Sequence, residues 1–510
     1  MSTTSEHPGP DATDVVIVGG GSAGAVLAAR LSADPRRTVL LIEAGPDYPA
    51  DRVPEGLLTP HLLADPDHDW GYTARATDRA PGIAAPRGRA MGGSSAVNAG
   101  VAIRARAADF AAWGERYGIK GWSYEEVLPA FRDLENTPAG DDAHHGRSGP
   151  FPIRQWTYEE LTSPLQAFVD SAAGLGNRRN DDFNGGRQDG TGAYPVNIVD
   201  GVRQNTALVY LTPQVRSRPN LTVLSDITVD RVLVEDGRAR GVVSASGAVF
   251  RAGEVVLSAG AYGSPAILLR SGVGPAADLR GLGIDVVADL PVGRRLQDHP
   301  FFHSMFALAP EHQTMTSAFA AHLWLASREA LPGELDLAVV GVHLLDGSFS
   351  PTGGAMVLSA AVTRPESRGS VRLASRDPHD APVIDDNYLA TDRDRRRMLE
   401  AVRLVRRLAG SAPLADALAA ELAPGAAVGS DEELAAAIET GIATYGHPTS
   451  TVPMGGPEDR WAVVDESGAV KGLSGLRVVD ASIMPEVPST VTNATTIMIA
   501  EHIARRVYGG

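Results

Sequence analysis

The chain has 510 residues, enough for two or more domains, and 43% of them are hydrophobic, which excludes intrinsic disorder for most of its length. The net charge of −16 disfavours nucleic acid and anionic lipid as partners, because both are negatively charged. Without cysteine, disulfides, thiolate nucleophiles and cysteine-bound metals are excluded. The N-terminus lacks a signal-peptide pattern and no apolar run reaches the roughly 18–20 residues of a membrane span. We therefore expect a cytoplasmic protein with no membrane contact.

The first predicted elements form a β-α-β unit. Residues 14–18 and 38–42 are β-branched or leucine-rich runs typical of buried strands, and residues 25–32 favour a helix. The turn Gly19-Gly-Gly-Ser-Ala-Gly24 follows the first strand. Its glycines permit a tight turn and close approach of a pyrophosphate, while the helix N-terminus supplies N–H donors. Because Glu43 ends the second strand, where a carboxylate can accept from ribose hydroxyls, the unit predicts a dinucleotide site.

The same turn admits a second interpretation. Gly20-x-Ser22-x-Gly24 matches the nucleophile elbow of α/β-hydrolases, with Ser22 as the nucleophile. That elbow normally follows several strands of its sheet and an earlier loop that completes the oxyanion hole, and neither precedes it here. We therefore favour Ser22 as a helix-start residue near phosphate, and keep a serine hydrolase as the alternative from outside the dinucleotide class.

Further along the chain, residues 51–100 are rich in loops and residues 136–150 form an irregular connection. Two capping boxes, at Ser123 and Ser430, each predict the start of a helix. The remaining predicted helices span 109–117, 124–135, 265–271, 392–408 and 494–506. The remaining predicted strands span 221–224, 229–235, 240–244, 249–258, 336–344, 357–362, 370–373 and 476–480, with a hairpin turn at 235–237.

Three further segments carry a family resemblance. Gly88-Arg-Ala-Met-Gly-Gly-Ser-Ser-Ala-Val-Asn98 resembles the first signature of the glucose–methanol–choline (GMC) oxidoreductases, and Ser258-Ala-Gly-Ala-Tyr-Gly-Ser-Pro265 resembles the second. Residues 476–485 followed by 492–501 resemble the C-terminal segment of that family. Order and spacing agree over residues 14–506, and the chain is most similar to choline oxidase-like and hydroxymethylfurfural oxidase-like members.

The resemblance implies an α/β (α+β) fold of two domains. The first is a Rossmann-like FAD-binding domain with a parallel sheet plus a β-meander, assembled from 12–155, 200–305 and 440–510. The second is a sheet-and-helix substrate-binding cap built from 156–199 and 306–439.

The resemblance also implies FAD as the cofactor. Some members attach the flavin to a histidine of the signature loop; Val97 stands at that position here, so we expect FAD to be bound non-covalently. For Trp70 and Val229, plain core packing is an equally open interpretation. The positions that match cofactor contacts of the family are Gly19, Gly21, Ser22, Ala23, Gly24, Glu43, Ala44, Trp70, Met91, Gly92, Gly93, Asn98, Ala99, Val101, Val229, Asp480 and Thr492.

His447 and Asn493 match the catalytic pair of the family. The resemblance implies oxidation of an alcohol to an aldehyde or ketone, with hydride transfer to flavin N5 and reoxidation by O2 or another acceptor. An imidazole can take the hydroxyl proton near neutral pH, and an amide N–H can stabilise the developing alkoxide. A hydroxynitrile-lyase-like enzyme of the same fold, with FAD in a structural role, is the alternative within the family.

Four positions depart from the pattern of choline-oxidising relatives. Ala307 and Val340 align where those relatives carry a glutamate and a second active-site histidine, so choline is not the expected substrate. Gly446 replaces a usual aromatic residue beside His447, which suggests room for a bulkier substrate. Ser450 replaces the usual glycine of His-Pro-x-Gly-Thr, so a different turn is expected there.

The other histidines carry weaker signals. His144 and His145 are adjacent in an acidic loop, but no third ligand lies at useful spacing, so no metal site is expected. His299, in Gln-Asp-His-Pro, is predicted to be a hydrogen-bonded loop residue. The expected partners are a small alcohol substrate and O2 or another electron acceptor. For the oligomeric state, monomer and homodimer both stay open.

Overall fold

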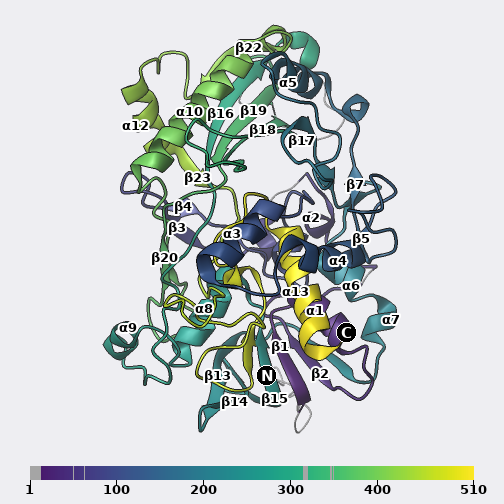
Figure 1. Ribbon diagram of the computed structural model, residues 1–510, viewed down its shortest axis with the longest axis vertical. Helices are drawn as coiled ribbons and strands as arrows, with labels where there is room; N and C mark the ends of the chain where they lie inside the picture. Colours follow the sequence, from purple (N-terminus) through teal and green to yellow (C-terminus); the bar gives the residue numbers. More distant parts are fainter. Residues whose placement is uncertain are drawn as a thin grey trace, which may run out of the picture.

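The computed structural model describes residues 13–49, 51–61, 64–313, 320–344, 347–348 and 350–509. Two large sheets dominate it, one in the lower and one in the upper half of the view in Figure 1. Helices flank both sheets, which confirms the predicted mixed α/β class with a second sheet-containing part.

The lower sheet has the strand order β12-β2-β1-β15-β14-β13, and β24 pairs with β15. Its parallel strands are β1 (Thr13–Val18), β2 (Val39–Ile42), β12 (Leu221–Leu224), β15 (Val249–Leu257) and β24 (Leu476–Val478). Antiparallel hairpins join β13 (Val229–Glu235), β14 (Arg238–Ser244) and β15. The predicted parallel sheet with a β-meander is therefore confirmed.

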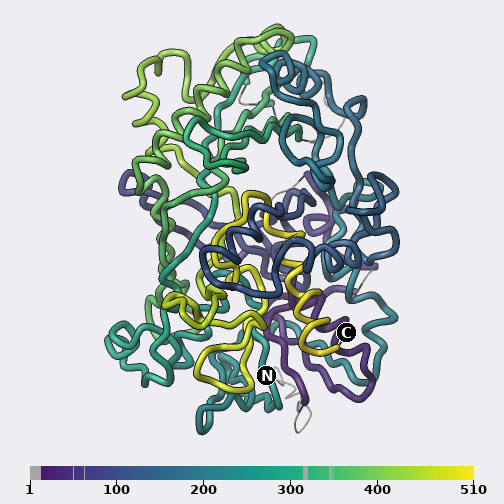
Figure 2. Tube along the Cα trace, in the orientation of Figure 1, coloured from purple at the N-terminus to yellow at the C-terminus, as the bar shows by residue number. Residues whose placement is uncertain are grey.

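The two ends of the chain meet at this sheet. Helix α1 (Gly24–Leu31) packs on β1 and β2, and the last helix, α13 (Asn493–Tyr508), lies against α1 (Figure 1). The purple and yellow segments of Figure 2 run side by side here. Arg30 of α1 and Glu501 of α13 form an ion pair of 2.8 Å. This contact brings the start of α13 toward the glycine-rich turn.

Local signals placed several helices well. Both predicted capping boxes are present, before α4 (Tyr124–Leu134) and α12 (Asp431–Gly441). The helix predicted from residue 265 instead begins five residues earlier, as α8 (Gly260–Arg270). The reason is Asp480, whose carboxylate accepts from the N–H of Gly260 and the hydroxyl of Ser264 and so fixes the extra first turn.

The upper, antiparallel sheet has the order β22-β16-β19-β18-β17-β8, and β23 pairs with β16. Its strands are β8 (Gly190–Ala193), β16 (Pro300–Leu308), β17 (Ala320–Leu325), β18 (Leu337–Leu344), β19 (Ala355–Val362), β22 (Leu418–Ala423) and β23 (Ile442–Thr444). Helices α5 (Ser163–Gly174), α10 (Asp392–Ala409), α11 (Leu414–Ala417) and α12 pack on one face, where alternate residues such as Phe302, Leu323 and Leu358 are buried. The other face meets residues of the lower half, among them Ile103 and Tyr445.

Two strand pairings bear on the predicted domain boundaries. A small sheet joins β20 (Ser370–Arg372) and β21 (Val383–Asp385) to β3 (Thr73–Arg75) and β4 (Ile83–Ala84). Residues 442–444 of β23 pair with residues 300–302 of β16; both segments were predicted to belong to the cofactor domain, yet they lie in the upper sheet, because β16 continues past residue 305. The division into a cofactor domain and a cap stays a prediction, but these strands tie the two halves together.

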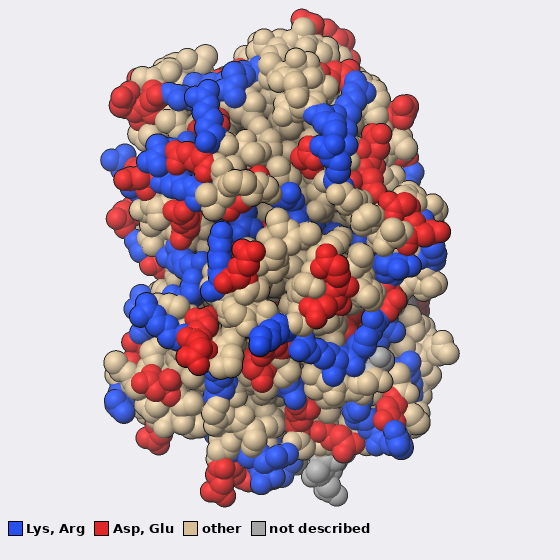
Figure 3. Space-filling model, viewed as in Figure 1, with Lys and Arg blue, Asp and Glu red and all other residues tan. Residues whose placement is uncertain are grey.

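Shorter elements connect the large ones. They are α2 (Glu55–Leu58), α3 (Ala107–Tyr117), α6 (Thr206–Tyr210), α7 (Pro213–Arg216), α9 (Ala276–Gly281), β5 (Glu135–Asn136), β6 (Phe151–Pro152), β7 (Arg154–Gln155), β9 (Pro195–Val196), β10 (Ile198–Val199) and β11 (Val202–Arg203). Among the described residues, no helix is long and apolar enough to cross a membrane. On the face drawn in Figure 3, basic and acidic side chains are interspersed.

Candidate active site

The glycine-rich turn is closely packed. Gly19 has a left-handed φ of +99°, and a Cβ on it would lie 2.5 Å from the carbonyl oxygen of Ser258. A Cβ on Gly24 would overlap the carbonyl oxygen of Gly19. No side chain caps the N-terminus of α1. The N–H of Ala25 donates to the carbonyl oxygen of Gly21, and the helix directs the positive end of its dipole toward the turn, which favours an anionic group there. Residues Gly21, Ser22 and Ala23 lie at this N-terminus, and their contact with a pyrophosphate stays a prediction.

Glu43 supports the turn from the end of β2. Its two carboxylate oxygens accept hydrogen bonds from the N–H groups of Gly20 (2.7 Å) and Gly45 (2.8 Å). Burial raises the pKa of Glu43 to about 7, although these hydrogen bonds oppose the shift. The carboxylate keeps further acceptor positions for a ribose hydroxyl, and Ala44 is half-buried next to it.

The signature loop lies directly on the turn. Gly92 donates its N–H to the carbonyl oxygen of Gly20 (2.9 Å), and the sulfur of Met91 occupies the space where a Cβ of Gly20 would stand. A Cβ on Gly93 would lie 2.7 Å from Cα of Gly21. The two backbones approach each other so closely that side chains on these glycines would fill the space around them. This geometry fits a dinucleotide held in a cradle of main-chain groups.

The remaining predicted cofactor positions are spread around this cradle. Trp70 stacks on Tyr72 with 5.7 Å between ring centroids, and Val229 is buried at the start of β13, so both also serve packing. Asn98 accepts from the N–H of Gly100 at 2.8 Å. The others are Ala99, which is exposed, Val101, which is half-buried, and Thr492, which precedes α13.

Asp480 has a mainly structural side chain. One carboxylate oxygen accepts from Gly260 N–H and the Ser264 hydroxyl, and the other accepts from the N–H and hydroxyl of Ser482, at 2.5–2.9 Å. With both oxygens engaged in this way, any contact of Asp480 with a cofactor falls to its backbone.

His447 is buried and its position is fixed from two sides. Its backbone N–H donates to Asp298 at 2.8 Å, and Nδ1 of its ring lies 2.9 Å from Nδ1 of His299. Burial, with His299 and Arg87 nearby, holds the pKa of His447 well below its ordinary value of 6.5. The imidazole is therefore neutral at neutral pH and can accept a proton.

His299 decides which nitrogen of His447 accepts that proton. Nε2 of His299 lies 3.0 Å from the carbonyl oxygen of Pro488, which can only accept, so Nε2 carries hydrogen. Burial lowers the pKa of His299, so its neutral ring offers a bare Nδ1 to the N–H at Nδ1 of His447. Nε2 of His447 is then left with a free lone pair. His299 is hydrogen-bonded, as predicted, but its contact with His447 escaped the sequence analysis.

Asn493, the first residue of α13, has an oriented amide. Its Oδ1 accepts from the hydroxyl of Ser22 at 2.8 Å, and among the described residues no group accepts from its buried Nδ2. An unpartnered buried N–H donor is costly unless a ligand accepts from it. The same bond argues against the hydrolase alternative, because Ser22 is held by an amide rather than by the imidazole that a serine nucleophile requires.

An aromatic cluster lies beside His447. The ring centroid of Tyr445 is 4.4 Å from that of His447. The Tyr445 ring also stacks on Phe301, with 4.0 Å between the centroids and an interplanar angle of 2°. The Tyr445 hydroxyl is 3.0 Å from that of Tyr194, which is 2.9 Å from Nδ1 of His322. Sequence reasoning missed this cluster, because its members lie far apart in the sequence and share no local pattern.

The structure shows the surroundings of the four positions that depart from the pattern of choline-oxidising relatives. A Cβ on Gly446 would lie 3.1 Å from Nη2 of Arg87, so the space beside Gly446 is bordered by this guanidinium. Ala307 is six residues from Phe301 on β16, about 20 Å along the strand, and does not neighbour the aromatic cluster. Val340 lies in the same hydrophobic core cluster as Phe301 and Tyr194. Ser450 keeps a glycine-like turn, with φ of +66°.

The two adjacent histidines have structural partners. His144 bonds to Asp141, and His145 lies between Glu135 and Asp182. In the described part of the chain, no group of three or more His, Cys, Asp or Glu residues could hold a metal ion.

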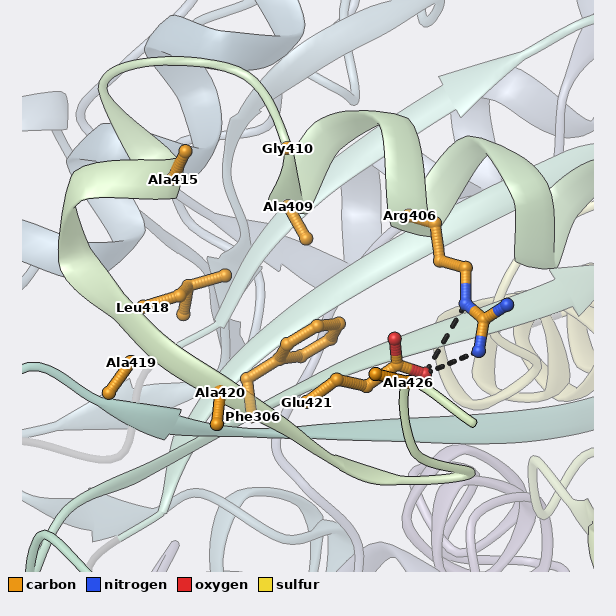
Figure 4. Close-up of a pocket in the computed structure, with 10 residues that line it drawn as sticks. All are labelled: Phe306, Arg406, Ala409, Gly410, Ala415, Leu418, Ala419, Ala420, Glu421 and Ala426. Carbon is orange, nitrogen blue, oxygen red and sulfur yellow. Dashed lines mark hydrogen bonds and ion pairs between the residues drawn. The ribbon is translucent and has the colours of Figure 1, made fainter. Parts of the chain in front are cut away.

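An open pocket of about 430 Å³ lies in the upper half, between the end of α10 and β22 (Figure 4). It is lined by Phe306, Leu418 and the ion pair of Arg406 and Glu421. Since Phe306 points to the helix-covered face of the sheet, this pocket is separate from His447.

The comparison with protein families decides the identity. Residues 13–301 match the N-terminal part, and residues 365–500 the C-terminal part, of the family described as GMC oxidoreductase. The chain belongs to the GMC oxidoreductase family. The resemblance found in the sequence is thereby confirmed.

This GMC oxidoreductase is similar to several known proteins over nearly its whole length. It is 38% identical to an oxygen-dependent choline dehydrogenase of Paraburkholderia phymatum, covering 97% of this chain and 92% of the relative. Pyridoxine 4-oxidase from Mesorbium loti has a TM-score of 0.88 at 36% identity, covering 98% and 99%. An FAD-dependent oxidoreductase from Chaetomium thermophilum has a TM-score of 0.85 at 26% identity, covering 96% and 98%.

Membership fixes the general chemistry. This GMC oxidoreductase is an FAD-dependent enzyme that oxidises a CH–OH group, with O2 or another compound as electron acceptor. The close approach of the two backbones at the glycine-rich turn, the N-terminus of α1 without a side-chain cap and, among the described residues, the unpartnered Nδ2 of Asn493 fit such a cofactor and substrate.

Proposed function

We propose that His447 is the base and Asn493 the alkoxide-stabilising donor in oxidation of an alcohol to an aldehyde or ketone. The observation that carries this proposal is the hydrogen-bond chain from Pro488 through His299 to His447, which leaves Nε2 of a neutral, buried imidazole unprotonated. Nδ2 of Asn493 supplies the complementary donor.

The cofactor is proposed to be bound without a covalent link. The turn from Gly19 to Gly24 and the loop from Met91 to Gly93 would hold the pyrophosphate, and Glu43 the ribose, while Val97 offers no nucleophile for attachment. When bound, FAD supplies the acceptor for the hydride that leaves the alcohol carbon. The proposed setting is a cofactor domain closed by a substrate-binding cap, in a cytoplasmic enzyme.

The chain's own residues would act as follows. Nε2 of His447 takes the hydroxyl proton of the alcohol, because it is the one nitrogen of the two imidazoles whose lone pair is free. Nδ2 of Asn493 donates to the developing alkoxide, a type of interaction worth about 2.7–4 kcal/mol in transition-state stabilisation. Asp298 holds the backbone of His447 in place, and burial of the ring limits access of water.

Anaerobic mixing of the yellow holoenzyme with alcohols tests the proposal. We expect bleaching of the flavin absorbance in the native enzyme, and a rate at least 1,000-fold lower in His447→Ala with FAD still bound, which corresponds to about 4 kcal/mol. A matched control is His312→Ala, at a half-buried histidine of the upper half that contacts Ser163. Bleaching of His447→Ala at the native rate would refute the role of His447.

The same experiment separates the lyase alternative. A hydroxynitrile-lyase-like enzyme would release cyanide from a cyanohydrin while the flavin keeps its colour. An oxidoreductase bleaches with its substrate and regains colour when its electron acceptor is admitted, and air identifies O2 as that acceptor.

A further inference from the structure

The face of the upper sheet that turns toward His447 has an ordered composition. Cross-strand partners point to the same side of a sheet, so the strand register gives rows of neighbouring side chains. The first row is Phe301, Ala361, Ala338 and Trp324; the second is His303, Ser359, Val340 and His322; the third is Met305, Val357, Val342 and Ala320. The first row joins Tyr445, and through it His447, by the stack of Phe301 on Tyr445.

None of these twelve described residues carries a charge at neutral pH. Partial desolvation of its ring by the surrounding protein lowers the pKa of His303, and full burial lowers the pKa of His322 to about 3, so both imidazoles are neutral. Two charged groups at the border of the face are cations: Arg106 lies over the ring of Trp324 at 5.4 Å, and Arg87 donates to the carbonyl oxygen of Gly446. An ammonium group placed against these twelve side chains would lose hydration without gaining a carboxylate from them, which is unfavourable.

The solvent-exposed part of this face lies around His303. The first row is buried, whereas His303 is exposed although it lies on the inner face of the sheet, and Met305, Val342 and Val357 are half-buried. Nδ1 of His303 bonds to the hydroxyl of Ser359 at 2.8 Å. No hydrogen bond of its Nε2 is found within the described ranges. The accessible part of the face is therefore apolar with one imidazole nitrogen left for a ligand.

Aromatic rings link this nitrogen to the proposed base. His303 contacts Phe301 at 4.8 Å, Phe301 stacks on Tyr445, and Tyr445 contacts His447 at 4.4 Å. Flat rings prefer such a surface, because they bury large apolar area and meet aromatic neighbours edge-to-face or offset.

We infer that the substrate of this enzyme is an uncharged aryl-methyl alcohol that lies against this face and places a hydrogen-bonding ring substituent at Nε2 of His303. The inference rests on the proposed function and names its substrate class. In the reaction the alcohol gives its hydroxyl proton to His447 and a hydride from its carbon to bound FAD, and it becomes the aldehyde. His303 is then a specificity-determining residue.

Matched pairs of alcohols test the charge and the shape of the substrate in anaerobic flavin bleaching by the holoenzyme. Choline and 3,3-dimethylbutan-1-ol have nearly the same shape and differ in charge; we expect kcat/KM at least 100-fold higher for the neutral alcohol. Benzyl alcohol and cyclohexylmethanol differ in planarity; we expect at least a tenfold preference for the aromatic alcohol. Equal or reversed values in either pair would overturn the inference.

A variant tests the role of His303. We expect His303→Phe to lower kcat/KM for 4-hydroxybenzyl alcohol at least tenfold relative to benzyl alcohol. His312→Phe, the same substitution at a histidine outside this face, serves as the control and should leave that ratio within twofold. An unchanged ratio in His303→Phe, measured on protein with native FAD content, would overturn the role of His303.

Different results would refute the proposed function and the proposed substrate class. If no alcohol of the set bleaches the flavin, or if His447→Ala reacts normally, the proposed function fails. If alcohols react and His447 is required, but choline matches its neutral analogue or His303 has no effect, only the substrate class fails.

Discussion

Nδ1 of His299 lies 2.9 Å from Nδ1 of His447, and Nε2 of His299 lies 3.0 Å from the carbonyl oxygen of Pro488. Because a carbonyl cannot donate, the direction of both hydrogen bonds is set from Pro488. His299 thus acts as a positioning residue, which keeps the reactive nitrogen of His447 bare and aimed away from the pair.

Replacing His299 tests this arrangement. In His299→Leu the ring of His447 loses its acceptor, so the wrong tautomer and other ring orientations become populated. We expect the rate of flavin bleaching to fall about 10- to 100-fold, with substrate KM changed less than threefold and FAD still bound. His299→Gln, whose amide oxygen can accept from Nδ1, should recover part of the rate. Equal rates in both variants would contradict a tautomer-setting role.

The pH dependence of the reaction follows from the lowered pKa of His447. The active form is the neutral imidazole, and a pKa below 6.5 means that this form persists as the pH falls through 6.5. We therefore expect kcat/KM to stay on its plateau at pH 6.5 and to decline only at lower pH. The measurement is a pH profile of anaerobic bleaching from pH 4.5 to 9. An acid limb centred above pH 6.5 would contradict the neutral resting state.

Asn493 and Ser22 give a graded pair of variants. Asn493→Leu removes the free Nδ2 donor, and we expect a 100- to 1,000-fold lower bleaching rate, as for loss of an oxyanion donor. Ser22→Ala removes only the hydroxyl that orients the amide, so a loss of at most about tenfold is expected. A serine hydrolase would show the opposite order, with Ser22→Ala abolishing esterase activity.

The backbone conformation of Ser450 predicts that its replacement by glycine and by alanine will differ in stability. Its φ of +66° is left-handed, which costs an L-residue roughly 1–2 kcal/mol, and its hydroxyl lies 3.0 Å from that of Thr449. Ser450→Ala and Ser450→Gly both lose the hydroxyl, but only glycine relieves the backbone. We expect Ser450→Gly to exceed Ser450→Ala by about 1 kcal/mol in free energy of unfolding. Denaturant unfolding of the holoenzymes measures this difference, and the reverse order would contradict it.

Elements with strong local signals agreed between sequence and structure. The β1–turn–α1–β2 unit, the capping boxes and α10 depend on contacts within one short segment, so composition and spacing predict them well. Strand β22, with the sequence Leu-Ala-Ala-Glu-Leu-Ala, has residues that favour a helix, and it is a strand because β16 pairs with it. Strand β17 was missed for the same reason. Strand β8 was missed because its sequence Gly-Thr-Gly-Ala carries no strand signal, and it is a strand because β17 pairs with it.

The sequence by itself determined the dinucleotide turn, the family and the positions of His447 and Asn493, since each lies in a contiguous motif with a fixed chemical meaning. Only the tertiary structure decided which nitrogen of His447 is free and which end of the Asn493 amide is available. Those choices depend on His299, 148 positions away from His447, and on Ser22, 471 positions away from Asn493. Hydrogen bonds between residues so far apart arise only when the sheets and helices pack, because no local pattern specifies their direction.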